Sequence, residues 1–275
     1  MIASCSVLID VDGKQCANDD DCVALGAAFA GSVCEHALCV KPAETAGGEA
    51  GGKTDVPSDP LQCTATELSS EPLVKYSFAP VFAPGAEPAD PKPFTIKACG
   101  QLDLECEHPV FGPLDVNAGE PQDFLVKPGF NGYFQITNPD TIDGLLFLGR
   151  VVNQDTMGWN VTLPTPELVS GLAAATGEKI DPELGYILAV ARDCEGTLLQ
   201  HVTFSNSQGG LGYYFVSNLP NTTVTETKVQ GAVGYANVPI STTTLTGVHN
   251  PSGHMLGPVS VRVKPHTLSF AEIWP

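Results

Sequence analysis

Short segments rich in Val, Ile, Phe, Tyr and Thr recur between Gly and Pro residues from residue 73 onward, and this pattern constrains the fold more than any other. The 28 Gly and 23 Pro among 275 residues favour strands and turns over helices. In the first segment Val74, Tyr76 and Phe78 alternate with Lys75 and Ser77, the period of a strand with one wet face. The sequence therefore predicts a mainly β fold of one or two antiparallel β-sandwiches. The predicted strands are 73–82, 94–99, 130–137, 145–152, 186–191, 198–205, 213–216, 224–228, 232–238 and 259–263.

One helix is predicted to interrupt the strands, at Pro166–Thr176. Thr165 precedes it as an N-cap, and Pro166 occupies the first helical position, where its missing N–H costs nothing. Glu167 lies in the first turn and Gly177 follows the last residue, as at a helix end. These signals place both ends of the helix.

Nine cysteines indicate an oxidising compartment, where they would form disulfides. Four of them lie in a stretch too short and polar to bury a core, so disulfides are expected to hold it together: Cys16, Cys22, Cys34 and Cys39. The other four are scattered over the body without paired metal-ligand spacing, which favours two disulfides over a metal site: Cys63, Cys99, Cys106 and Cys194. A local bridge from Cys99 to Cys106 is the easiest to close.

Cys5 is left over by this division, and the residues before it resemble a bacterial lipobox. The tetrapeptide from Ile2 to Cys5 predicts a mature protein that starts at Cys5 and is anchored to a membrane by lipid. The alternative is that Cys5 pairs within the neighbouring cysteine cluster or is a free thiol. The expected location is the cell envelope, as a membrane-anchored lipoprotein or an extracellular protein. The sequence contains no run of about 18 apolar residues, so no membrane-spanning helix is predicted.

Four regions are expected along the chain. Residues 1–40 hold the lipobox-like start and the cysteine-rich module, and residues 41–62, rich in Gly, Ala, Pro and acidic residues, are expected to form a flexible linker. A first β-sandwich is predicted over 63–160. The helix and a second β-sandwich are predicted over 161–275.

The last region resembles a known family of β-sandwiches. The segments DPELGYILAVARDCEGTLLQHVTFS, GLGYYF, NTTVTETKVQGAVGYANVP and VSVRVKP are similar to the carboxypeptidase regulatory-like, transthyretin-like family. The resemblance rests on an Asp-x-x-Gly turn at 193–196, a Thr-x-x-x-Gly turn at 227–231 and a strand that closes at Pro239. It implies a transthyretin-like or immunoglobulin-like sandwich in an accessory module without catalytic residues. The earlier β region looks like a divergent domain of the same kind.

The cysteine-rich module carries a second resemblance. The pattern QCANDDDC, a Gly-containing apolar stretch and then LCV is similar to a small module near the N-terminus of secreted proteins and lipoproteins of myxobacteria. This resemblance implies export, in agreement with the lipobox-like start.

Charge and motifs exclude several classes of function. The formal net charge of −18 would repel a phosphate backbone, so no nucleic-acid partner is expected. The sequence contains no GxSxG, HExxH or GxGxxG motif, so serine hydrolase, zinc protease and dinucleotide chemistry are unsupported. Glu105 and Glu107 are candidates for a catalytic acid and base. No other catalytic residue is expected to lie beside them, and we expect both to face solvent.

Two metal sites are alternatives to the expectation of no cofactor. Intradiol dioxygenases are distantly similar sandwiches that hold ferric iron with two Tyr and two His, for which the candidates here are Tyr213, Tyr214, His249 and His254. These histidines have four residues between them, wider than that family's spacing, which favours a structural role. Calcium could be held by acidic residues of the N-terminal module, although such loops are usually just solvated. The candidate calcium residues are Asp10, Asp12, Gly13, Asp19, Asp20 and Asp21.

Aromatic side chains could form a platform for a carbohydrate or protein ligand, with core packing as the alternative. The candidates are Trp159, Trp274, Tyr213 and Tyr214. The leading prediction is a non-enzymatic cell-surface or periplasmic lipoprotein that acts as a binding or spacer module. The alternatives are a carbohydrate- or protein-binding module of the adhesion type and a metal-dependent enzyme of the intradiol dioxygenase type.

Overall fold

The computed structural model describes residues 18, 33–35, 38–40, 60–64, 66–176, 179–217 and 219–275. The chain divides into two compact units, 1–56 and 57–275. In the first unit β1 (Val33–Glu35) pairs antiparallel with β2 (Leu38–Val40), and the register sets Cys34 directly opposite Cys39. The predictions for Cys5, Cys16, Cys22 and the candidate calcium residues lie outside the described residues, as does most of the predicted linker.

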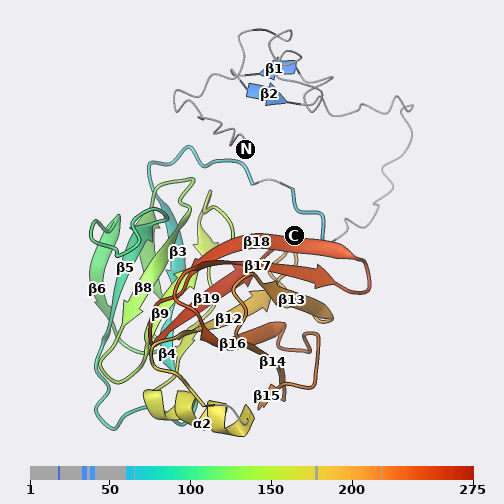
Figure 1. Cartoon of the computed structure of the whole chain (residues 1–275). Helices are drawn as coiled ribbons and strands as arrows, with labels where there is room; N and C mark the ends of the chain where they lie inside the picture. The colour runs from blue at the N-terminus through green and yellow to red at the C-terminus, as the bar shows by residue number, and fades with distance from the viewer. Residues whose placement is uncertain are drawn as a thin grey trace, which may run out of the picture. The chain divides into compact units, whose positions relative to one another are not determined.

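The second unit is built on one sheet of nine strands (Figure 1). In spatial order these strands are β15 (Leu219–Asn221), β14 (Leu211–Val216), β16 (Ala232–Val238), β12 (Gly185–Ala191), β19 (Thr267–Ile273), β9 (Asp143–Phe147), β8 (Gly132–Thr137), β5 (Phe94–Gly100) and β6 (Phe111–Val116). Two three-stranded sheets accompany it: β10 (Thr156–Met157), β3 (Val74–Phe78) and β7 (Gln122–Val126), and β13 (Val202–Asn206), β17 (Thr242–His249) and β18 (His254–Arg262). A short pair joins β11 (Val161–Leu163) to β4 (Pro80–Phe82).

The two smaller sheets cover opposite faces of the large sheet. The first core packs the β3 and β7 side chains against β5, β8 and β9, and the second core packs β13, β17 and β18 against β12 and β16. Successive side chains of a strand point to opposite faces. Along β12, accordingly, Tyr186 and Leu188 contact the first core, whereas Ile187 and Ala189 belong to the second. The fold is mainly β and sandwich-like, as predicted.

β19 joins the parts of this unit that precede and follow the predicted boundary between 63–160 and 161–275. It lies between β12 and β9, and its backbone pairs in parallel with both. All seven of its residues are buried. Ladder hydrogen bonds cross this boundary, and residues 57–275 form one compact unit with two large cores and a small third cluster of Cys99, Cys106, Tyr133 and Leu145. The strands were predicted to pair antiparallel, but at the centre of the sheet β19 pairs in parallel with both of its neighbours.

Local sequence signals correctly predicted the bounds of α2 and β16. The helix α2 spans Pro166–Thr176, and Thr165 caps it by accepting a hydrogen bond on Oγ1 from the Leu168 N–H at 3.3 Å. β16 matches its predicted range, whereas the predicted strand over 224–228 is not one. That segment instead exchanges hydrogen bonds with Val202 and its neighbours through Thr227, whose side chain is fully buried.

Candidate functional site

The two tryptophans of the chain line one cavity of about 220 Å³. We call this cavity the tryptophan pocket and define it by six of its lining residues: Tyr76, Arg150, Trp159, Arg192, Glu272 and Trp274. Tyr76 comes from β3, Arg192 follows β12, and Glu272 lies at the end of β19. The pocket therefore forms where the central strands of the large sheet end beside the β3 and β10 sheet.

A buried ion pair lies at the centre of the pocket wall. Arg192 Nε donates to Glu272 Oε1 at 2.8 Å, and Arg192 Nη1 donates to the Gly196 carbonyl oxygen at 2.5 Å. The side chains of Arg192 and Glu272 are only 13% and 6% exposed. Burial raises the pKa of Glu272, and the Arg192 guanidinium opposes that rise. The pair thus satisfies two groups that would be costly to bury alone.

Arg150 and Trp274 form the second part of the wall. The Arg150 guanidinium carbon lies 3.7 Å from the centroid of the Trp274 ring, a close cation–π contact. Trp274 itself is buried, and its Nε1–H donates to the Leu148 carbonyl oxygen at 3.1 Å. Arg150 is exposed and is joined to no carboxylate by an ion pair among the described residues. Its charge lowers the pKa of Glu272 from longer range, but no ion pair with a described residue holds the guanidinium.

Gly149 explains how the Arg150 loop approaches β19 so closely. Its φ of +68° lies in the left-handed region, and a Cβ there would come within 1.8 Å of the Glu272 carbonyl oxygen. Only glycine tolerates both conditions. The residue before Arg150 thus allows the guanidinium to reach the Trp274 ring.

Two polar atoms in the pocket wall are buried without a hydrogen-bond partner. They are the Tyr76 hydroxyl oxygen and the Trp159 indole nitrogen. Tyr76 is 2% exposed, and a Cβ at the neighbouring Gly158 would lie 2.5 Å from its hydroxyl. Burial, followed by the charge of Glu272, raises the pKa of Tyr76, so its hydroxyl keeps its proton and remains a donor. Unpartnered buried polar groups are rare and call for an explanation such as a ligand.

The rim of the pocket is a turn fixed to the start of the unit by a disulfide. Cys63 is bonded to Cys194, and the Cys194 N–H also donates to the Pro60 carbonyl oxygen at 2.9 Å. The predicted Asp-x-x-Gly turn forms here, with Asp193 Oδ1 accepting from the Thr197 N–H at 2.8 Å. Glu195, exposed, is the acidic residue of this turn that lines the pocket. The disulfide therefore supports the loop that borders the pocket.

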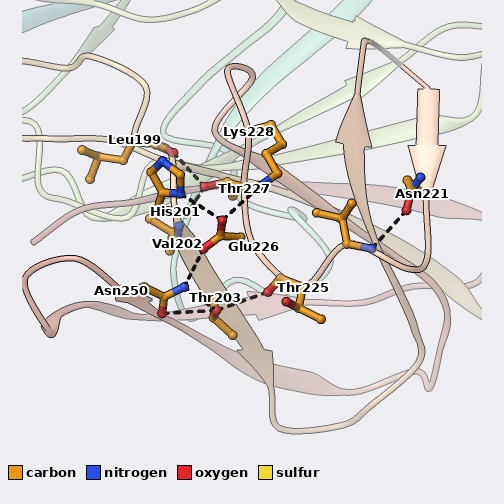
Figure 2. A network of polar contacts seen from close by, with 11 residues as sticks. Leu199, His201, Val202, Thr203, Asn221, Thr225, Glu226, Thr227, Lys228 and Asn250 are labelled. Carbon is orange, nitrogen blue, oxygen red and sulfur yellow. Dashed lines mark hydrogen bonds and ion pairs between the residues drawn. The ribbon is translucent and has the colours of Figure 1, made fainter.

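A second polar cluster lies on the surface, centred on Glu226 (Figure 2). Its carboxylate contacts His201 Nδ1 at 2.9 Å, Lys228 Nζ at 3.0 Å and Asn250 Nδ2 at 2.9 Å. The hydrogen bonds from His201, then Asn250 and Lys228, lower the pKa of Glu226 to about 2. The bonds from His201 and Asn250 tie residues 224–228 to the residue before β13 and to the turn after β17, whereas Lys228 lies within the segment itself, so the cluster has a structural role.

The register of β17 and β18 sets His249 opposite His254, but the structure does not bring Tyr213 and Tyr214, the other two candidate iron ligands, together. Tyr213 packs against the first core and Tyr214 lies in the second, so neighbouring residues of β14 point to opposite faces of the sheet. The Tyr214 hydroxyl accepts a hydrogen bond from the Phe204 N–H at 3.0 Å. His249 instead contacts Ser252 Oγ at 2.8 Å. The tyrosines are packing residues, and the four side chains do not form an iron site.

Glu105, one of the two candidates for an acid and base, has structural partners. Glu105 binds Arg262 Nη2 at 2.5 Å and Lys264 Nζ at 2.8 Å, and the pKa of Glu105 is lowered chiefly by Lys264. Glu105 also lies within the loop closed by the disulfide from Cys99 to Cys106. Within the described residues, no group of three or more His, Cys, Asp and Glu side chains is arranged to hold a metal ion. No helix in the same part of the chain is long and apolar enough to span a membrane.

Sequence reasoning singled out both tryptophans but missed the charged and hydroxyl groups around them. Trp274 is not an open platform, because it is buried and Arg150 lies over its ring. One signal for the rest was present: Glu272 is the only charged residue of β19, an otherwise apolar and hydroxyl-bearing strand, and a buried carboxylate requires a partner. Neither its partner Arg192 nor Tyr76 is near it in sequence.

Comparison with known proteins adds only distant structural matches. No family model and no curated protein matches the sequence. Solved structures with some similarity include a streptococcal ancillary pilin (14% identity, TM-score 0.23, covering 74% of this chain and 63% of that chain) and the minor pilin GBS52 of Streptococcus agalactiae (11%, 0.24, 73% and 95%). A third is the shaft pilin SpaA from Lactobacillus rhamnosus GG (13%, 0.21, 73% and 96%). At these TM-scores the similarity carries no argument about function, and the carboxypeptidase regulatory-like resemblance stays a prediction.

Proposed function

We propose that this chain is a non-enzymatic binding module of the cell envelope or extracellular space, and that the tryptophan pocket is its carbohydrate-binding site. The observation that carries the proposal is a small cavity with two tryptophans and a tyrosine in its wall, in which two polar groups lack partners. Small-molecule sites combine aromatic surface with a few placed polar groups. Here Trp159 would offer the aromatic surface, because Trp274 lies beneath Arg150 and Tyr76 is buried. A sugar fits this combination because its ring has apolar faces and its hydroxyls can satisfy donors.

Two further observations support the proposed location. Disulfides link Cys63 to Cys194 and Cys99 to Cys106, and such bonds persist in oxidising compartments outside the cytosol. The lipobox-like sequence ending at Cys5 provides the proposed lipid anchor, with 41–62 as a tether. In this proposal the second unit is held away from the membrane and presents its pocket to the exterior.

Carbohydrate binding is tested with the full chain on an array of immobilised polysaccharides and oligosaccharides. We expect saturable binding to a subset of glycans, and Trp159→Ala should reduce it about tenfold or more, because this change removes both an aromatic wall and an indole donor. Phe215→Ala, a half-buried aromatic of β14 outside the pocket, is the control and should bind like the original chain. Glycan binding that Trp159→Ala leaves intact would contradict the assignment of the site.

The anchor is tested separately by mass spectrometry of protein from the membrane fraction of the native host. The proposal predicts an N-terminal peptide that begins at an acylated Cys5. An unmodified peptide that contains Cys5 would refute the anchor without affecting the pocket.

A further inference from the structure

We propose that the tryptophan pocket recognises an acidic saccharide, a sugar ring that carries a carboxylate; this inference rests on the proposed function and names the ligand class. Three hydrogen-bonding groups of the pocket that lack partners among the described residues are donors, whereas the Glu195 carboxylate at the rim is an acceptor. The Arg150 guanidinium and the Trp159 indole N–H can only donate, and the protonated Tyr76 hydroxyl can also donate. These three donors are complementary to a ligand rich in acceptors.

The formal net charge of −18 repels acidic ligands at long range, so the selection of an acid over a neutral sugar depends on a local cation in the pocket. Arg192 is already paired with Glu272 at 2.8 Å, whereas Arg150 acts on Glu272 only at longer range and makes no ion pair with any described residue. Stacking on Trp274 at 3.7 Å restrains the guanidinium plane and reduces the rotamer entropy lost on binding. A guanidinium binds a carboxylate through two parallel N–H···O bonds. Arg150 is therefore prepared to bind the carboxylate of a ligand.

Size and spacing favour a sugar over an acidic peptide. The cavity of about 220 Å³ is smaller than the roughly 300 Å³ at which pockets for drug-sized ligands begin, so it fits a single ring. The donors of Tyr76, Trp159 and Arg150 come from three separate segments around this cavity. One aspartate or glutamate side chain brings acceptors at a single point, whereas a uronate-type ring carries hydroxyl oxygens and a carboxylate around its circumference.

The test compares each acidic oligosaccharide with its own methyl ester, which keeps the ring and removes the charge. Oligomers containing glucuronate or galacturonate are titrated into the full chain by calorimetry, and tryptophan fluorescence follows the same titration because both tryptophans of the chain lie in the pocket. The expected result is that at least one acid binds about tenfold or more tightly than its ester, with affinity that falls as salt rises.

Two variants assign this preference to the pocket. Arg150→Gln should bring the affinity for the acid down to that for the ester, and Lys127→Gln, an exposed charge outside the pocket, should leave the preference intact. Glu195→Gln removes a negative charge from the rim and should raise the affinity for the acid about twofold. Because Glu195→Gln is expected to raise the affinity for the acid whereas Arg150→Gln is expected to lower it, the Glu195 variant gives a second readout that does not depend on how well the Arg150 variant folds.

The outcomes separate this inference from the proposed function. Equal affinity for acids and esters, or an acid preference that Arg150→Gln leaves unchanged, would overturn the acidic ligand while carbohydrate binding stands. Absence of binding by every saccharide tested would overturn both. Displacement of the bound acid by a polyglutamate peptide at equal carboxylate concentration would also overturn the inference, because charge alone would then suffice.

Discussion

Glu226 shows how one side chain can make stability depend on pH. Its pKa lies at about 2 in the folded chain against an ordinary value of 4.5, because His201, Asn250 and Lys228 bind the carboxylate. A lowered pKa contributes stability that is full above the unfolded value and is lost as pH falls through the folded value. We therefore expect the contribution of Glu226 to decline between about pH 4.5 and pH 2.

The measurement is the thermal midpoint from pH 2 to pH 7 for the original chain, Glu226→Gln and the control Glu87→Gln. Glu226→Gln should lower the midpoint at pH 6, and this deficit should shrink toward pH 2. Glu87 is exposed, and its variant should follow the original chain. A constant difference between Glu226→Gln and the original chain across this range would show that the contacts do not depend on ionisation.

At the residue scale, features that depend on neighbouring residues could be predicted from the sequence, whereas the pocket could not. The α2 boundaries follow from a cap, a proline and an acidic residue within a few positions of one another. The pocket depends instead on residues far apart in sequence: Tyr76, Arg150, Arg192 and Glu272. Only the topology of the sheets brings them together. The tryptophans could be singled out by type alone, but not their burial or their partners.

The disulfide from Cys63 to Cys194 acts at the scale of elements, because it joins the start of the second unit to the turn after β12. Its cysteines are 131 residues apart, whereas Cys99 and Cys106 are only 7 apart. Loop entropy predicts that removing the long-range bond costs about 5 kcal/mol and the local bond about 2 kcal/mol. The Cys63→Ser/Cys194→Ser pair should therefore be the less stable in urea. An equal loss, or a larger one in Cys99→Ser/Cys106→Ser, would contradict this ranking.

Exposure of one face did not decide which strands could be predicted from the sequence. β3, with an exposed residue between buried ones, was predicted, and so were β12 and β16, which are buried on both faces. β19, buried on both faces, was missed, and so were β7 and β17, in which buried and more exposed residues alternate. The segment over 224–228 has strand composition yet is held by side-chain bonds through Thr227. The composition of the sequence therefore predicted the β class, but it could not predict which strands pair with one another.

At the scale of the whole molecule, the C-terminal strand makes the two halves interdependent. β19 supplies Leu268 and Phe270 to the first core and Ala271 and Ile273 to the second. A chain truncated after residue 266 should lose protease resistance over the whole of 57–275, because β9 and β12 both lose their parallel partner. Limited proteolysis with mass spectrometry checks this. A resistant fragment covering 63–160 would show that the first half folds alone, as two separate sandwiches would require.

The most direct test of the tryptophan pocket as a ligand site is the response of the two indole N–H signals in a ¹H–¹⁵N NMR spectrum. Trp274 Nε1–H is bonded to the Leu148 carbonyl oxygen at 3.1 Å, whereas Trp159 Nε1–H has no partner, so the two signals report different environments in one cavity. Trp159→Phe assigns them by removing one. On addition of an acidic oligosaccharide we predict a saturable shift that is larger for Trp159 than for Trp274. Saturable binding by calorimetry with both indole signals unmoved would contradict the account, because the ligand would then bind elsewhere.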